Sequence, residues 1–189
     1  MPSLIPGRGK GRNPNRNTNM KLEKRSLKNI IRLAKKAFAC DYEINKLSQF
    51  SSMEELLEKS SDQDKAFWAE WYAGVVMKKR WPEAEEIILK NMSSAYNYAL
   101  HIMKERWTQA EAIFLTRADY SAAYAVNLMK ERWPEAEAII ASDACEAVWY
   151  ARNMIKERWP EAEETISKDF YWRRRYEDLF NCTIGSPSR

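Results

Sequence analysis

The sequence is poor in the residues on which most enzymes depend. Its 189 residues include one histidine, His101, which excludes every mechanism that needs two. The five glycines build no glycine-rich loop that would hold a phosphate in front of a helix. Three cysteines, Cys40, Cys145 and Cys182, form no CxxC pair, which argues against a zinc knuckle and a disulfide framework. We therefore expect a protein that is not an enzyme and needs no metal or cofactor.

Long apolar runs are also missing. No stretch of about 18 apolar residues occurs, so no membrane span and no membrane partner are predicted. The first twenty residues carry four basic side chains and no apolar segment, so no signal peptide is predicted. We therefore expect the protein inside a cell or in a particle assembled there.

Charge is divided unevenly along the chain. The net charge is +4, yet residues 1–40 hold eleven Lys or Arg and one acid, whereas residues 41–189 hold twenty bases and twenty-six acids. Residues 1–20 are rich in Pro, Gly and Asn and have little to bury, so we expect a basic arm, disordered when free or extended along a partner. The sequence thus predicts a basic segment attached to a mildly acidic body.

Residues 21–40 predict an amphipathic helix, because apolar side chains recur at steps of three and four from Leu27 to Phe38. Two interpretations of its basic face stay open: the helix lies on nucleic acid or another anionic surface, or it docks on the body with a solvated basic face. A transition follows to residue 68, with a short helix near residues 52–58. The candidate contacts to nucleic acid or an acidic partner are the cations Arg8, Lys10, Arg12, Arg16, Lys24, Arg25, Lys28, Arg32, Lys35 and Lys36.

The rest of the chain is a tandem repeat with a period of 26 residues. Trp81, Trp107, Trp133 and Trp159 stand at this spacing, and a Tyr-Ala pair keeps the same step from residue 72 onward. A period held this closely indicates stacked copies of one supersecondary unit. The tryptophans and tyrosines are therefore expected to pack in the core and turns.

Each unit is predicted to contain two helices. Helix A, about residues 95–106 in one copy, has an apolar stripe through Tyr98 and Ile102. Helix B starts at a proline such as Pro82, because proline is well tolerated at the first helical position and disfavours helix in the residue before it. Such a unit buries its apolar face only by stacking. We expect an all-α solenoid of four to five repeats over residues 69–181, followed by a tail at 182–189.

The repeated segments MKKRWPEAE, MKERWTQAE, MKERWPEAE and IKERWPEAE, with VWYARNMIKERWPEAE as one full copy, are similar to a known pattern. They resemble tandem helical repeats of the form YWYAKDVIKGRWPEAE in proteins of tailed bacteriophages. The resemblance covers about residues 69–180 and implies a phage or phage-derived protein, located in the host cytoplasm or packaged in a virion, but no activity. This chain departs from the pattern at Lys79, Glu105, Glu131 and Glu157, where Gly is common, which should alter the turn between units.

Positions that vary between copies are free to meet a partner, whereas positions that repeat build the stack. The varying positions of helix A, Ala123 among them, lie on a face other than the Tyr-Ala stripe, and a lysine series extends that face. Tryptophan is a common interface anchor, although Trp71 and Trp149 have an alternative in packing against residues 42–68 or the last helix. The candidate protein interface is Trp71, Lys78, Asn97, His101, Lys104, Asn127, Lys130, Trp149, Arg152, Asn153 and Lys156.

Two functions follow from these patterns. The first is a phage-type interaction or scaffold protein, including a virion component, whose repeats bind protein and whose basic arm anchors to nucleic acid or an acidic partner. The second is an early phage effector that binds and inhibits a host protein, for which the arm matters less. An enzyme is the weakest of the alternatives, for want of histidines, glycine loops and metal-ligand spacing.

Overall fold

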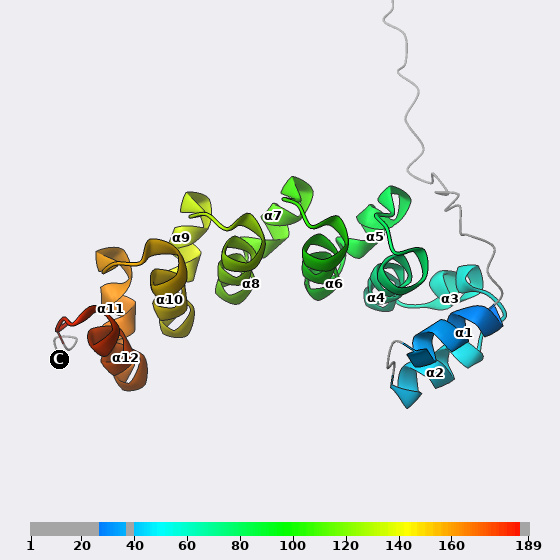
Figure 1. The fold of residues 1–189 in the computed structure, drawn as a ribbon, viewed down its shortest axis with the longest axis horizontal. Coiled ribbons are helices and arrows are strands. Elements are labelled where there is room, and N and C mark those ends of the chain that lie inside the picture. The colour runs from blue at the N-terminus through cyan, green and yellow to red at the C-terminus, as the bar shows by residue number, and fades with distance from the viewer. Residues whose placement is uncertain (1–26, 37–39, 186–189) are drawn as a thin grey trace, which may run out of the picture.

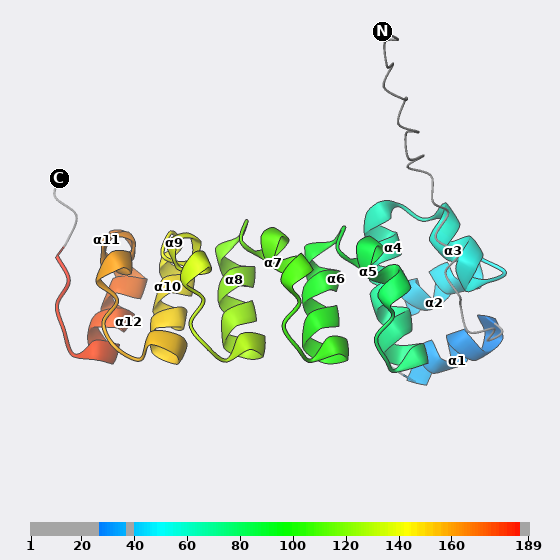
Figure 2. The same cartoon turned by 90° about the horizontal axis from the view of Figure 1, so that it is seen from above.

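The computed structural model describes residues 27–36 and 40–185, and every regular element within these ranges is a helix (Figure 1). The all-α prediction is therefore confirmed. The helices follow one another in a shallow arch, with α1 near one end and α12 at the other (Figures 1 and 2). None of the described helices combines the length and the apolar character that crossing a membrane requires.

Three helices precede the repeats: α1 (Leu27–Lys36), α2 (Asp41–Ser48) and α3 (Met53–Lys59). Ser52 caps α3 by accepting the backbone N–H of Glu55, which confirms the short helix predicted there. Helix α2 falls where only a transition was expected. Helix α1 buries Ile30 and Ala34, members of the predicted apolar stripe, and contacts α2 and the first repeat.

Each repeat consists of a helix A and a helix B, joined by a turn. Helix A has an α-helical first part and a π-helical last turn in four copies. These copies are α4 (Asp62–Trp71) with η1 (Tyr72–Met77), α6 (Met92–Asn97) with η3 (Tyr98–Met103), α8 (Ala118–Tyr124) with η4 (Ala125–Met129), and α10 (Ala144–Tyr150) with η5 (Ala151–Ile155). The last helix A is α12 (Phe170–Phe180). The B helices are η2 (Pro82–Ala84) with α5 (Glu85–Ile88), α7 (Thr108–Phe114), α9 (Pro134–Ile140) and α11 (Pro160–Lys168).

Helix A ends earlier than the predicted break before the tryptophan. In the copy expected to reach residue 106, it ends at Met103 because Lys104 has φ 58°, in the left-handed region. The N–H of Lys104 donates to the carbonyl of Ala99, five residues back, at 2.8 Å, which closes the π turn. The same positive φ recurs at the equivalent lysines. These are Lys78, Lys130 and Lys156.

A polar joint connects each repeat to the next. The Tyr98 hydroxyl accepts the backbone N–H of Trp81 at 2.6 Å and donates to Glu85 Oε1 at 3.2 Å. Nε and Nη2 of Arg80 donate to the same Glu85 carboxylate, at 2.6 and 3.1 Å. The Tyr98 ring packs on Trp107 of its own repeat, with ring centroids 5.3 Å apart. One tyrosine therefore links two repeats, and the predicted burial of the Trp and Tyr series is confirmed.

The same joint recurs along the array. The backbone N–H of Trp107, Trp133 and Trp159 donates to a tyrosine hydroxyl of the following repeat, at 2.6, 2.8 and 2.5 Å. Successive A helices contact one another and form the inner side of the arch, whereas the B helices lie on its outer side (Figure 1). Side chains on one face of the A helices thus meet across repeat boundaries.

Candidate functional site

A surface hollow of about 740 Å³ lies between the A helices of the last three repeats, α8, α10 and α12. Side chains from all three helices line it, so no single repeat contains it. The lining residues are Asp119, Ala123, Cys145, Glu146, Val148, Trp149, Arg152, Trp172, Arg175, Asp178 and Leu179.

The repeat boundary beside the hollow differs in sequence from the boundary before it. Between α6 and α8, the rings of Tyr96 and Tyr120 meet edge to face at 5.7 Å and fill the boundary together with Phe114. One period later, Ala122 and Glu146 stand at the positions of those two tyrosines. A methyl group and a carboxylate replace two rings there; the Ala122 methyl is fully buried, whereas Glu146 lines the hollow.

The structure brings two of the predicted interface residues together at the hollow. Trp149 and Arg152 line it from α10 and η5, and Ala123 faces them from α8. The hollow also contains residues of α12, which lies outside the predicted set. Arg175 stands 26 residues after Trp149, so the repeat spacing could have identified this α12 residue as part of the same site.

The other predicted interface residues lie elsewhere. Trp71 is half-buried beside Trp68, with ring centroids 5.8 Å apart, in the first repeat. The Asn127 side chain donates to the Tyr96 hydroxyl at 2.9 Å, and Asn153 donates to the carbonyl of Trp149 at 2.7 Å. The remaining members lie outside the lining of the hollow, and all but the half-buried Asn97 are exposed. These are Lys78, Asn97, His101, Lys104, Lys130 and Lys156.

The hollow carries opposite charges on its lining. Arg152 and Arg175 supply guanidinium groups, whereas Asp119 and Glu146 supply carboxylates. Burial raises the pKa of Glu146, and the nearby Asp143 and Asp119 raise it further. The lining, which also includes the carboxylate of Asp178, therefore offers contacts for both signs of charge beside the half-buried rings of the hollow.

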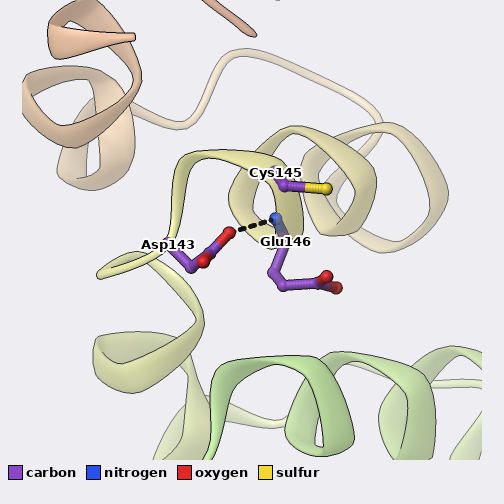
Figure 3. Close-up of side chains that lie close together, drawn as sticks. All are labelled: Asp143, Cys145 and Glu146. Carbon is purple, nitrogen blue, oxygen red and sulfur yellow. Dashed lines mark hydrogen bonds between the residues drawn. The ribbon is translucent and has the colours of Figure 1, made fainter.

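Asp143, Cys145 and Glu146 form a small cluster at the start of α10 (Figure 3). Their ligand atoms lie within 4.8 Å of one another. Asp143 Oδ1 accepts the backbone N–H of Glu146 at 3.0 Å and so acts as the helix cap. Burial and then the two carboxylates raise the pKa of the Cys145 thiol, whereas metal binding needs the thiolate. Helix capping accounts for this geometry.

The basic segment is described only in part. On α1, Lys28, Arg32, Lys35 and Lys36 are exposed, on the side opposite the buried Ile30 and its neighbours. Helix α1 is therefore docked on the body and keeps a basic face in solvent. The other predicted contacts lie outside the described residues, namely Arg8, Lys10, Arg12, Arg16, Lys24 and Arg25.

No family model matches the chain, and neither a curated protein nor a solved structure matches it. A function must therefore be inferred from the chemistry of the hollow and of the exposed surfaces.

Proposed function

We propose that the chain is a non-enzymatic, phage-type interaction protein whose repeats bind another protein through the hollow between α8, α10 and α12. The observation that carries this proposal is that Trp149 and Trp172 line one hollow together with Arg152 and Arg175. Tryptophan and arginine are the side chains that most often dominate the energy of protein interfaces. At the boundary between α6 and α8 the equivalent space holds the packed rings of Tyr96 and Tyr120, so the site depends on residues that vary between copies.

The lining specifies how a partner would bind. An apolar side chain of the partner inserts between the two tryptophans, where it displaces water from their ring faces. An acidic group of the partner meets the arginines, and a basic group meets Asp119 and Glu146. Charges of both signs set the orientation of the partner, because the reversed orientation would bring like charges together.

The basic N-terminal segment supports a second contact in the same proposal. The exposed cations of α1 continue the basic character of residues 1–26, and together they anchor the protein to nucleic acid or an acidic partner. This arrangement favours a scaffold or virion component. An early phage effector that inhibits a host protein is the alternative, and it would need the hollow but not the basic segment.

The hollow is tested with two tryptophan variants at equivalent repeat positions. Trp149 lines the hollow, whereas Trp71, three periods earlier, is similarly half-buried but lies outside it. We expect Trp149→Ala to lose the stoichiometric partner recovered from infected host cells and Trp71→Ala to retain it. Loss with both variants, or with neither, would contradict the proposal.

The scaffold and the effector are distinguished by a truncation. The deletion should stop at residue 26, because α1 contributes Ile30 and Ala34 to the core. A chain of residues 27–189 should lose its function if it is a scaffold anchored by the arm, and should keep inhibiting its target if it is an effector.

A further inference from the structure

Large apolar side chains are exposed at the two ends of the array. Among the described residues they are Tyr42 on α2 and Phe170, Tyr171 and Leu179 on α12. Phe170 is 71% exposed and Tyr171 is 57% exposed, and they are adjacent in the first turn of α12. A helix that ends a repeat array is expected to present a polar outer face. This face instead presents two aromatic rings.

The repeat register shows that this face is the one that would contact another repeat. Arg174 stands three periods after Tyr96, whose ring packs against Tyr120 of the next helix A. In the described chain no helix covers Arg174, which is exposed. The outer face of α12 is therefore an unpartnered stacking surface.

Arginine surrounds the two exposed rings. The guanidinium of Arg173 lies over the Phe170 ring at 5.7 Å from its centroid, and that of Arg175 lies over the Tyr171 ring at 5.8 Å. Each guanidinium is thus held beside an aromatic ring. Together with the exposed Arg174, this places three cations around two rings on one short helix.

The acids of α12 take part in other contacts. Asp169 Oδ1 accepts the backbone N–H of Trp172 and caps the helix. Glu177 Oε1 accepts the backbone N–H of Ile184 at 2.9 Å, and Asp178 lines the hollow. Near the two rings, the three arginines therefore outnumber the one neighbouring acid, Asp169.

Charge argues against pairing this face with the same face of a second copy. Pairing α12 with α12 would bring two sets of three arginines together, which is unfavourable because like charges repel. Joining two copies head to tail would bring these arginines near an end that carries both the exposed cations of α1 and the acids Asp41 and Glu43 of α2, so charge does not favour that contact either (Figure 1). A polyanion avoids this repulsion.

We propose that the outer face of α12 binds single-stranded nucleic acid. Unpaired bases stack on Phe170 and Tyr171, while the guanidinium groups of Arg173 and Arg174 contact phosphates; Arg175 belongs to the lining of the hollow. Exposed rings beside cations are the elements that proteins use to bind single strands without sequence preference. A duplex keeps its base faces covered by its own stacking, so this face selects unpaired strands. The proposal is independent of the hollow and of the basic N-terminal segment.

The test measures binding of the full chain to fluorescein-labelled oligo-dT, oligo-rU and a DNA duplex, by fluorescence anisotropy across a salt titration. Phe170→Ala should weaken binding to the single strands by at least about fivefold, the effect of losing one stacked base. Tyr42→Ala is the matched control. Tyr42 is also 71% exposed with a cation over its ring, Lys46 at 6.0 Å, but it is flanked by Asp41 and Glu43. Its loss should leave binding unchanged.

A second variant and a second measurement complete the test. Arg174→Gln should weaken single-strand binding and reduce its salt dependence by about one phosphate contact. This variant tests the proposal even if Phe170→Ala does not fold. Binding of the duplex should not change with either variant. The proposal is overturned if the parent chain binds neither single strand, or if Phe170→Ala and Tyr42→Ala weaken binding equally. Sedimentation that shows self-association lost in Phe170→Ala, with single-strand affinity unchanged, would assign the face to a second copy and also overturn it.

Discussion

Replacing Tyr98 with Phe tests whether the joint between repeats depends on one hydroxyl group. The change keeps the ring, which packs on Trp107, and removes only the oxygen that accepts the Trp81 N–H. The Tyr98 side chain is fully buried, and burial raises its pKa, so the hydroxyl is protonated throughout the working pH range and donates to Glu85.

The magnitude follows from what the substitution leaves behind. Without the hydroxyl, the buried backbone N–H of Trp81 has lost the acceptor that it uses in the structure. Leaving a buried donor without an acceptor costs about 1–3 kcal/mol, which exceeds the roughly 0.5–1.5 kcal/mol of an average hydrogen bond. The Glu85 carboxylate loses the bond from the Tyr98 hydroxyl but keeps its two hydrogen bonds from Arg80, so this part of the cost is small. We expect Tyr98→Phe to lower the free energy of unfolding by about 2 kcal/mol.

Urea unfolding gives the global value, and amide hydrogen exchange gives the local one. The Trp81 amide should exchange roughly 30-fold faster, if local opening becomes easier by about 2 kcal/mol. Tyr96→Phe is the control, because the Tyr96 hydroxyl accepts only the exposed Asn127 side chain. It should change stability by less than about 0.5 kcal/mol. Equal and small effects of the two substitutions, with unchanged exchange at Trp81, would refute the reasoning.

Three further predictions concern other positions. Lys156→Gly should raise stability by about 0.5–1 kcal/mol in urea unfolding, because Lys156 has φ 64° and glycine adopts this conformation without strain. Glu157→Gly, at the next residue, should give no gain. Burial raises the pKa of Glu70 to about 7, so stability should fall as pH rises from about 4.5 to 7, and Glu70→Gln should remove that fall in thermal melts. The Arg132 guanidinium lowers the pKa of Glu137 in the folded chain. The stabilisation from this ion pair is therefore present above the ordinary glutamate pKa and is lost as pH falls through the lowered pKa of Glu137. Arg132→Gln should reduce this acid sensitivity of the melting temperature.

The repeat and its helix starts were predictable because they depend on local rules. Pro134 and Pro160 begin their helices, as expected for proline at a first helical position. The end of helix A was not predictable in this way. No glycine marks the left-handed residue, since lysine occupies it at Lys104 and its equivalents, and the break that the sequence does mark, before Trp107, lies three residues later.

The hollow could not be predicted because it depends on which positions of neighbouring repeats touch. Tyr96 and Tyr120 occupy different positions within their own repeats, and the sequence alone does not show that these two positions are in contact. Once they are paired, the repeat step from Tyr120 leads to Glu146, which lines the hollow. The missing information was therefore the register between helices.

The joint also explains why the most regular part of the sequence says least about function. In the segment RWPEAE, the Arg and the second Glu form the ion pair, the Trp N–H meets the tyrosine, the Pro starts helix B, and the buried Ala allows close packing. Every one of these contacts lies within the repeat array, so the segment specifies the architecture of this chain and not its partner. Specificity must then reside in positions that the joint leaves free, such as Trp149 and Arg175. Exchanging those side chains for their counterparts in another copy should change binding while leaving stability nearly unaltered, and a large loss of stability would show that they serve the stack instead.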